Sequence, residues 1–249
     1  MKKTIILLAA AVAFCSCQIN FGNGIKGIHT LTVRCNGEVQ EKTYDLKDFN
    51  EIMVKGQANV KFAQAESFLV SVKANEEVFE YLELEVNDGE LVISTQNGVN
   101  ILAKTYEVMV TAPLLTDVTV SGAADLDLTD GYTADEDLDI DVNGAGDLQL
   151  VGVSVPSMDI TINGAGDLDV VNAKVKELDV TVNGAGDVSI DNVTAGSVSI
   201  TTRGAGAVKI SGTADQADYH VAGAGSVDAR YLKCESTTTA KHGAASIKL

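Results

Sequence analysis

The chain has 249 residues, with 35 acidic residues against 18 basic ones and a formal net charge of −17. This excess of negative charge repels phosphate groups, so nucleic acid is excluded as a partner, and anionic lipid surfaces are disfavoured in the same way. Tryptophan is absent, which argues against a sugar site built on exposed aromatic rings. The length suits one domain or one elongated array.

The N-terminus has the pattern of a secretory signal. A basic start is followed by an apolar run from Ile5 to Phe14, which is shorter than the about 20 residues needed to span a bilayer. Small Ser16 stands directly before Cys17, as in a bacterial lipobox. We therefore predict a signal peptide over residues 1–16 and lipidation of Cys17. An ordinary signal with chance cysteines is the alternative.

Residues 17–27 are expected to form the lipid anchor and a polar, glycine-rich tether. Removal of the signal takes away Lys2 and Lys3 and no acid, so the net charge moves from −17 to −19. Membrane contact is then expected from acyl chains, at about 0.8 kcal/mol for each buried methylene. We expect an outer-membrane lipoprotein of the cell envelope; the sequence leaves open whether it faces the periplasm or the outside.

Residues 28–112 are expected to form less regular β coils. Asn36-Gly37 and Asp88-Gly89 are turn pairs between alternating runs. Glu76 to Tyr81 has the length of one helical turn, and VKGQANVKF (Val54 to Phe62) has the outline of a degenerate repeat. This half is not periodic enough to predict its topology.

Residues 113–249 carry a regular repeat. The phrase NGAGDL and its variants recur seven times, and their first glycines are separated by 22, 20, 20, 20, 19 and 20 residues. A fixed period of this size predicts a solenoid in which each coil stacks on the last. The predicted fold is all-β, a parallel β-helix with coils of about 20 residues, and right-handed by the general preference of crossover connections. A stack of β-hairpins in an open sheet is the structural alternative.

Apolar and polar residues alternate strictly within each repeat. Around Asn163, Met158, Ile160 and Ile162 share one parity, whereas Asp159 and Thr161 share the other. This alternation predicts strands that bury one face, and it excludes helices, because residues two apart cannot share one helical face. A short connector with a small apolar pair, such as Ala173 and Val175, is expected to form a third, thinner wall.

Glycines are expected at a column of structural corners, where a side chain would be crowded. These corner glycines are Gly122, Gly144, Gly146, Gly164, Gly166, Gly184, Gly186, Gly204, Gly206, Gly223, Gly225 and Gly243. In the last coil the inward positions before Gly243 are Thr237, Thr239 and Lys241, a polar set that suits the capping end of a solenoid.

Aspartates recur at one repeat position and raise the question of calcium. Asp125, Asp147, Asp167 and Asp187 follow the corners, but each coil offers one such carboxylate, and the nonapeptide spacing of calcium-binding repeats is absent. We interpret them as turn residues that accept hydrogen bonds from corner amides. No metal or cofactor is predicted. GAGDL also lacks the third glycine and the following helix of a dinucleotide site.

Candidate catalytic residues do not emerge. The three histidines are dispersed, and no HExxH motif occurs. Outward pairs such as Asp167 and Asp169 leave open a two-carboxylate hydrolase, although solvated surface is the simpler interpretation. Cys35 and Cys234 belong to opposite ends of the array, so we expect no disulfide between them.

The repeats SGAADLDL, NGAGDLQL, NGAGDLDV and NGAGDVSI, together with their lead-in, resemble the auto-transporter adhesin head GIN domain family, also called DUF2807. The resemblance covers about residues 49–249. It implies β-helical modules on secreted or lipid-anchored proteins, and it brings no catalytic or ligand residues. No translocator follows the repeats, so we expect a lipoprotein and no autotransporter mechanism.

The function that we expect is that of a non-enzymatic adhesion or binding module. A repetitive surface provides area, whereas catalysis needs a few unlike groups gathered around one reacting atom. The partner, protein or polysaccharide, stays unidentified. The alternatives are a carbohydrate-active β-helix enzyme, either hydrolase or lyase, and a structural spacer.

Overall fold

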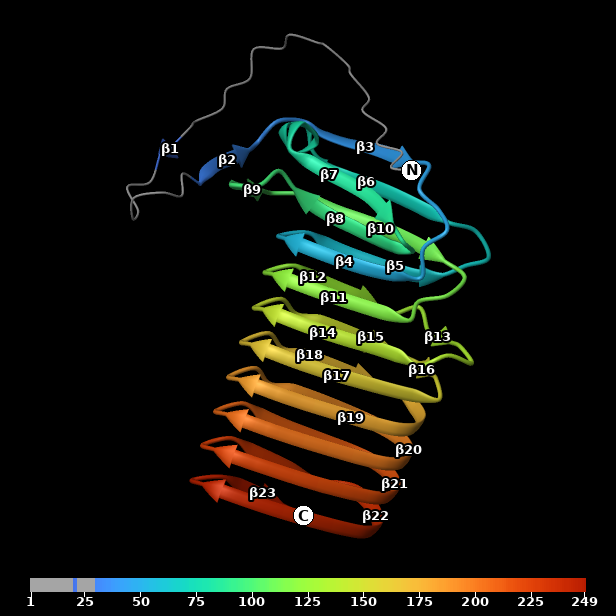
Figure 1. Ribbon diagram of the computed structural model, residues 1–249, viewed down its shortest axis with the longest axis vertical. Coiled ribbons are helices and arrows are strands. Elements are labelled where there is room, and N and C mark those ends of the chain that lie inside the picture. Colours follow the sequence, from blue (N-terminus) through green and yellow to red (C-terminus); the bar gives the residue numbers. More distant parts are fainter. Residues whose placement is uncertain (1–19, 22–29) are drawn as a thin grey trace.

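The chain forms a rod of stacked β coils (Figure 1). This computed structural model describes residues 20–21 and 30–249. The predicted signal peptide and Cys17 lie outside the described residues. The fold is a parallel β-solenoid of about 7 turns with coils of about 20 residues, as the repeat period predicts.

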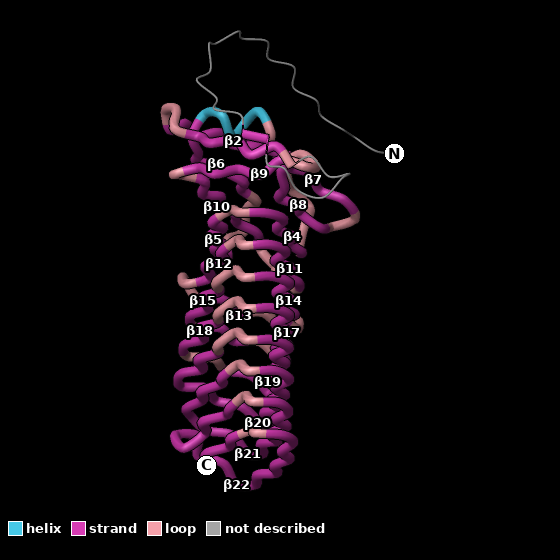
Figure 2. Tube along the Cα trace, turned by 90° about the vertical axis from the view of Figure 1, so that its left-hand side faces the viewer, coloured by secondary structure: helices cyan, strands magenta, loops and turns pink. Residues whose placement is uncertain are grey.

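Three walls of strands surround a single core (Figure 2). The first face contains β4 (Glu51–Gly56), β11 (Asp117–Gly122), β14 (Leu138–Gly144) and β17 (Ser157–Gly164). The second face contains β5 (Asn59–Gln64), β12 (Asp125–Leu128), β15 (Leu148–Val151), β18 (Leu168–Val171) and β23 (Ser246–Lys248). The third, narrow face begins with β13 (Tyr132–Thr133) and β16 (Val153–Ser154).

Four long strands continue these walls by running through more than one face. They are β19 (Lys174–Gly184), β20 (Val188–Gly204), β21 (Ala207–Gly223) and β22 (Ser226–Gly243). Neighbouring coils pair in parallel and in register, so that Ile140, Ile160, Val180 and Ile200 form one row. Parallel pairing excludes the stack of hairpins. In Figure 1 the first-face strands run in front toward the glycine corner, and the chain then returns behind them. Because the coils descend from the N-terminal to the C-terminal end, this course makes the solenoid right-handed. Figure 2, seen from the glycine corner, has the first face on the right and the second face on the left.

The alternation of the sequence corresponds to burial. Met158, Ile160 and Ile162 are fully buried, whereas Asp159 is exposed and Thr161 is half-buried. The small apolar pairs of the connectors are also buried and complete the third wall. The predicted parity and the predicted three-walled coil are therefore confirmed.

The corner glycines stack in two columns along the rod. Gly122, Gly144 and Gly164 are in register, and a Cβ on Gly144 or Gly164 would overlap the carbonyl oxygen of the glycine in the coil before. The same holds in the second column, where a Cβ on Gly166 would overlap Gly146. The coils therefore approach each other too closely at these corners for any side chain.

A second corner, which the sequence analysis did not identify, joins the second and third faces. Gly152, Asn172 and Asn192 have φ values of 72°, 60° and 61°, in the left-handed region that glycine and asparagine tolerate. The side-chain amide of Asn192 donates to the side-chain oxygen Oδ1 of Asn172 at 2.7 Å. Glycine or asparagine at this point of successive repeats is the signal that predicts such a corner.

The N-terminal half forms one coil and a cap. The cap contains β1 (Asn20–Phe21), β2 (Leu31–Cys35), β3 (Val39–Tyr44), β6 (Leu69–Asn75), the 3-10 helix η1 (Glu76–Glu80), β7 (Leu82–Asn87), β8 (Glu90–Thr95), β9 (Val99–Ala103) and β10 (Tyr106–Ala112). The short helix and the hairpin of β7 and β8 lie where the sequence predicts a helical turn and a turn pair.

The stacking order in this half differs from the chain order. Strands β4 and β5 pair on one side with β11 and β12, which confirms that VKGQANVKF is a degenerate repeat. On their other side they pair with β8 and β10, from later in the chain. Strand β6 pairs antiparallel with both β10 and β3. Residues 51–64 therefore lie between residues 90–112 and 117–128.

Buried polar side chains fasten this cap. Glu77 is only 5% exposed, and its carboxylate accepts hydrogen bonds from the backbone amides of Asn36 and Gly37 at 2.9–3.1 Å. Asn75 accepts from the amides of Lys104 and Thr105 and donates to the Gly37 carbonyl. These bonds satisfy the buried groups and hold two turns against the helix.

The opposite end of the described chain is polar. Thr237, Thr239 and Lys241 occupy inward positions and are exposed, whereas Tyr219, in register with Thr239 in the coil before, is buried. Cys35 ends β2 and Cys234 belongs to β22, strands that lie at opposite ends of the rod in Figure 1, and no disulfide joins the two cysteines. In the part of the chain that the structure describes, no helix has the length and apolarity to cross a membrane.

Candidate functional site

The first face carries a row of carboxylates, one from each of six neighbouring strands. We call this set the acidic row; it consists of Glu90, Glu51, Asp117, Asp139, Asp159 and Asp179, which are in register across β8, β4, β11, β14, β17 and β19. Adjacent strands lie about 4.8 Å apart. The carboxylates are therefore close enough to repel one another across the surface.

Two members of the acidic row have a raised pKa. The pKa of Asp117 is raised by partial burial and by the nearby charges of Glu51, Asp141 and Asp139. The pKa of Asp159 is raised by partial burial and by Asp179, Asp139 and Asp141. Within the described residues, no lysine, arginine or histidine forms an ion pair with the acidic row.

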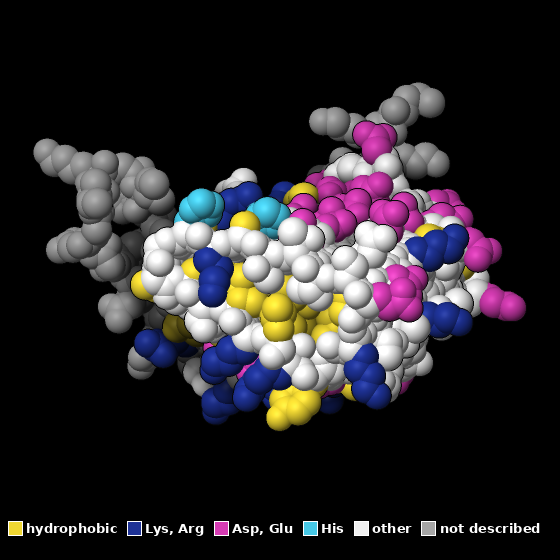
Figure 3. All heavy atoms as spheres, turned by 90° about the horizontal axis from the view of Figure 1, so that it is seen from below, with side chains coloured by type: hydrophobic (Ala, Val, Ile, Leu, Met, Phe, Trp, Pro, Cys, Tyr) yellow, Lys and Arg dark blue, Asp and Glu magenta, His cyan; other side chains and the backbone are white. Residues whose placement is uncertain are grey.

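Threonine lies on the same face two residues further along β11, β17 and β19, at Thr119, Thr161 and Thr181. Thr161, Thr181 and Thr201 are in register, with Asp141 preceding them in β14. Seen from the C-terminal end, acidic side chains gather on one side of the rod (Figure 3). Most of the visible lysine and arginine side chains lie on the other sides (Figure 3). The first face is thus a regular, flat and negatively charged surface.

The aspartates that follow the glycine corners form a column on the second face and accept hydrogen bonds from the backbone. A side-chain oxygen of Asp125, Asp147, Asp167 and Asp187 accepts a hydrogen bond from the amide at the equivalent position of the next coil, at 2.9–3.4 Å. The donors are the amides of Asp147, Asp167, Asp187 and Ala207. The interpretation of these residues as turn aspartates therefore agrees with their geometry.

Amide side chains form a second ladder beside the glycine corners. Asn183 donates to Asn163 at 2.9 Å, and Asn163 donates to Asn143 at 3.0 Å. Arg203 extends the ladder by donating to the Asn183 oxygen at 3.3 Å. Each bond joins one coil to the next, so these asparagines also have a structural role.

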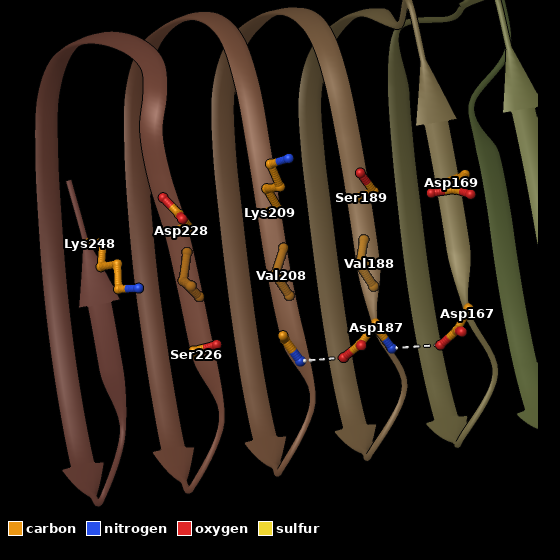
Figure 4. Close-up of a pocket in the computed structure, with 12 residues that line it drawn as sticks. Asp167, Asp169, Asp187, Val188, Ser189, Val208, Lys209, Ser226, Asp228 and Lys248 are labelled. Atoms are coloured by element: carbon orange, nitrogen blue, oxygen red, sulfur yellow. Dashed lines mark hydrogen bonds between the residues drawn. The ribbon is translucent and has the colours of Figure 1, made fainter.

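A shallow depression of about 410 Å³ opens on the second face near the C-terminal coils (Figure 4). Its lining changes along the rod, from Asp167 and Asp187 at one end to Lys209 and Lys248 at the other. Asp228, between the two lysines, forms a two-point ion pair with Arg230, with nitrogen–oxygen distances of 2.7 and 2.9 Å. Arg230 lowers the pKa of Asp228 to about 2.

Among the described residues, no histidine or cysteine lines this depression. The histidine that contacts a carboxylate, His220, lies 3.3 Å from Asp218 on the exposed first face. His242 is exposed, and His29 lies outside the described residues. Over residues 30–249, no three histidine, cysteine, aspartate or glutamate side chains converge as metal ligands. The predicted corner glycines line the stacked turns and present no side chain to a ligand.

The acidic row is the part of this surface that the sequence analysis missed. The outward aspartates within the repeats follow from the alternation, but no local pattern connects them with Glu51 and Glu90, which precede the regular region. An alignment of EIMVKG (Glu51 to Gly56) with DVTVSG (Asp117 to Gly122) would have revealed Glu51. Glu90 could not be found in this way, because its strand stacks out of chain order.

Comparison with solved structures supports the same fold. An adhesin from Bacteroides fragilis NCTC 9343, described as "putative", has a TM-score of 0.78 at 20% identity, over 86% of this chain and 98% of that one. A "putative lipid binding protein" from Parabacteroides distasonis ATCC 8503 has a TM-score of 0.75 at 18% identity, over 87% and 98%. A "putative adhesin" from the same organism has a TM-score of 0.69 at 19% identity, over 87% and 99%.

No curated protein matches the chain. The descriptions of the three solved structures name adhesins and a lipid-binding protein, and none names an enzyme. The family described as "Putative auto-transporter adhesin, head GIN domain" matches residues 48–210 and 170–249, which together span most of the chain. The chain therefore belongs to this family, DUF2807, as the repeats suggest.

Proposed function

We propose that this protein is a non-enzymatic, lipid-anchored module of the cell envelope that binds another macromolecule through its first face. The acidic row is the observation that carries the proposal. Six carboxylates in register extend along the rod, and none of them forms an ion pair with a lysine, arginine or histidine of the described residues. The family description, which names an adhesin, agrees with a binding role.

The chemistry of this face favours a partner with positive charge. A cationic protein or an amino-containing polysaccharide would bring its charges next to the carboxylates of Asp117 and Asp159, whose pKa is raised by partial burial and by the neighbouring negative charges. A flat sheet face provides contact area, whereas small ligands are generally held in concave pockets. Because surface charges are screened by salt, binding is expected to weaken as ionic strength rises.

The anchor is the second part of the proposal. Acylation of Cys17 would tie the N-terminal end of the chain to the outer membrane through the tether over residues 17–27. Mass spectrometry of the mature N-terminus tests it directly. We expect a diacylated or triacylated Cys17 in the membrane fraction, and release of the protein from that fraction by Cys17→Ser. An unmodified N-terminus in the native protein would refute the anchor and leave the binding proposal unaffected.

Neutralisation of the acidic row tests the binding surface. The variant Asp139→Asn/Asp159→Asn/Asp179→Asn removes three adjacent charges and leaves the core untouched. We expect it to lose most of the binding to immobilised cationic proteins and to amino-containing glycans, measured by surface plasmon resonance at low and high salt. Retention of binding would overturn the choice of the first face.

A matched control removes the same net charge elsewhere. Asp127→Asn/Asp130→Asn/Asp169→Asn lies outside the first face and spares the aspartates that accept backbone hydrogen bonds. We expect it to bind like the unmodified protein. If both triple variants lose binding equally, net charge alone accounts for the interaction. Turnover of any glycan in the same panel would instead favour a carbohydrate-active enzyme, and the absence of any ligand would favour a spacer.

A further inference from the structure

Five asparagine–glycine pairs occur in the described part of the chain, and this pair is chemically labile. Glycine has no side chain to hinder the attack of its own amide nitrogen on the preceding asparagine. The nitrogen bonds to the side-chain Cγ, the Cγ–Nδ2 bond breaks, and ammonia leaves with the proton lost by the amide. Water then opens the cyclic imide to aspartate or isoaspartate. The pairs begin at Asn36, Asn97, Asn143, Asn163 and Asn183.

The three pairs of the repeats are held in a conformation that disfavours this reaction. Asn143, Asn163 and Asn183 are tied together by side-chain hydrogen bonds, which direct each amide toward the neighbouring coil. The glycines that follow are the ends of paired strands and are in register with one another. Rearrangement into a cyclic imide would require the local unpairing of adjacent coils.

The pair at Asn36 is protected in a different way. The Gly37 amide, which would have to attack, donates to the carboxylate of Glu77 at 2.9 and 3.1 Å. Glu77 is 5% exposed, and the Asn36 amide is bonded to the same carboxylate. The Gly37 nitrogen is therefore engaged in a partly buried hydrogen bond and is not available to attack the Asn36 side chain.

The pair at Asn97 has none of these restraints. Asn97 and Gly98 are both exposed in the turn between β8 and β9, and Gly98 has a φ of 80°. Among the hydrogen bonds of residues 30–249, none involves the Asn97 side chain or the Gly98 amide. The Gly98 carbonyl is bonded, because it accepts from the Leu31 amide at 2.7 Å.

We propose that Asn97 is a site of spontaneous deamidation and isoaspartate formation, and that the fold protects the other four pairs. The modification has a structural consequence. Isoaspartate would add a methylene to the backbone next to β9, whose first residue, Val99, is in register with Leu31 of β2. The pairing of β2 with β9, which covers the N-terminal end of the core with the buried Val33 and Ile101, would be weakened.

Ageing of the purified mature chain tests this inference. The protein is kept at mildly alkaline pH and 37 °C, and peptides are analysed over time by mass spectrometry and by isoaspartyl methyltransferase labelling. We expect Asn97 to be modified about tenfold or more faster than Asn36 and the repeat asparagines, because only local opening exposes those. In urea-unfolded chain the five pairs should react at similar rates. Equal rates in the folded protein, or no reaction at Asn97, would overturn the proposal.

The variant Asn97→Gln separates modification from other effects of ageing. Glutamine keeps the amide, but its longer side chain does not form the same five-membered ring. Hydrogen exchange of β2 and β9 should become faster in the aged protein and stay unchanged in aged Asn97→Gln. Faster exchange in both would show that the loosening has another cause, and would refute the structural consequence.

Discussion

Three glycine-to-alanine changes separate the two reasons why glycine is needed in this rod. At Gly152 the φ of 72° lies in the left-handed region, but the nearest atom to a new Cβ, the Gly131 Cα, is 3.4 Å away. At Gly144 the φ is outside that region, yet a Cβ would overlap the carbonyl oxygen of Gly122. At Gly164 both conditions hold, with a φ of 154° and an overlap with Gly144.

The expected costs follow from these geometries. Gly152→Ala should lower the free energy of unfolding by about 1 kcal/mol, the strain of a left-handed alanine partly offset by a less flexible unfolded chain. Gly144→Ala must separate two coils and lengthen the bond from the Ala145 amide to the Gly122 oxygen, now 2.8 Å. Loss of two or three such bonds, at about 1 kcal/mol each, predicts a cost of about 2–3 kcal/mol. Gly164→Ala should cost more than either.

Urea unfolding of the purified mature chain, followed by far-UV circular dichroism, measures these differences in the free energy of unfolding. The comparison requires that the dependence of this free energy on urea concentration is the same for all variants. The order of destabilisation is expected to be Gly152→Ala, then Gly144→Ala, then Gly164→Ala. If Gly144→Ala is no more damaging than Gly152→Ala, the close approach of the coils does not explain the glycine column. The requirement would then lie in backbone conformation alone.

Further predictions concern the core and the acidic row. Ile160→Asp should destabilise the fold by about 5 kcal/mol or more in denaturant melts, whereas Thr161→Asp should cost less than about 1 kcal/mol, because only Ile160 is buried; equal losses would refute the parity. Thr202→Val should stabilise by about 1 kcal/mol in thermal melts, since the fully buried Thr202 hydroxyl has no partner among the described residues; lower stability would show that it has one. Asp159→Asn should raise stability at neutral pH, and the gain should disappear in acid. The folded-state pKa of Asp159 is raised, so its charge destabilises the fold above that pKa and not below the unfolded value. A gain that persists in acid would contradict this cause.

The regular half of the fold could be predicted because each of its rules is local. A strand that buries one face alternates with period two, and a coil that repeats carries its glycine at a fixed interval, so Ile160 and Gly164 could be placed from the sequence. The Asn172 corner obeys an equally local rule, but its signal is weaker, because asparagine replaces the glycine found at the equivalent Gly152 and asparagine also occurs outside left-handed corners. The buried Tyr132 is harder to predict, because its hydroxyl is bonded to both backbone groups of Leu115, which lies between β10 and β11.

The acidic row was only partly predictable for a different reason. Outward Asp139 and Asp159 follow from parity, but the continuous row depends on which strands are neighbours. Strand pairing between β4 and β8 joins residues far apart in sequence and against the chain order. No local pattern encodes that choice, since it depends on which partner covers the free edge of the first coil.

The first coils are stacked in an order that differs from their order in the chain. This affects how the rod can fold while the chain is being synthesised from its N-terminus. Residues 51–64 have both hydrogen-bonding edges open until residues 90–128 are available, because their two neighbours are made later. The rod therefore cannot lengthen coil by coil from its first strand. A long loop must close before any stack exists, which makes the early step slow. Once these first coils have paired, each later coil can pair with the already folded coil before it. This step closes a loop of only about 20 residues. Nucleation and elongation are thus assigned to different parts of one sequence.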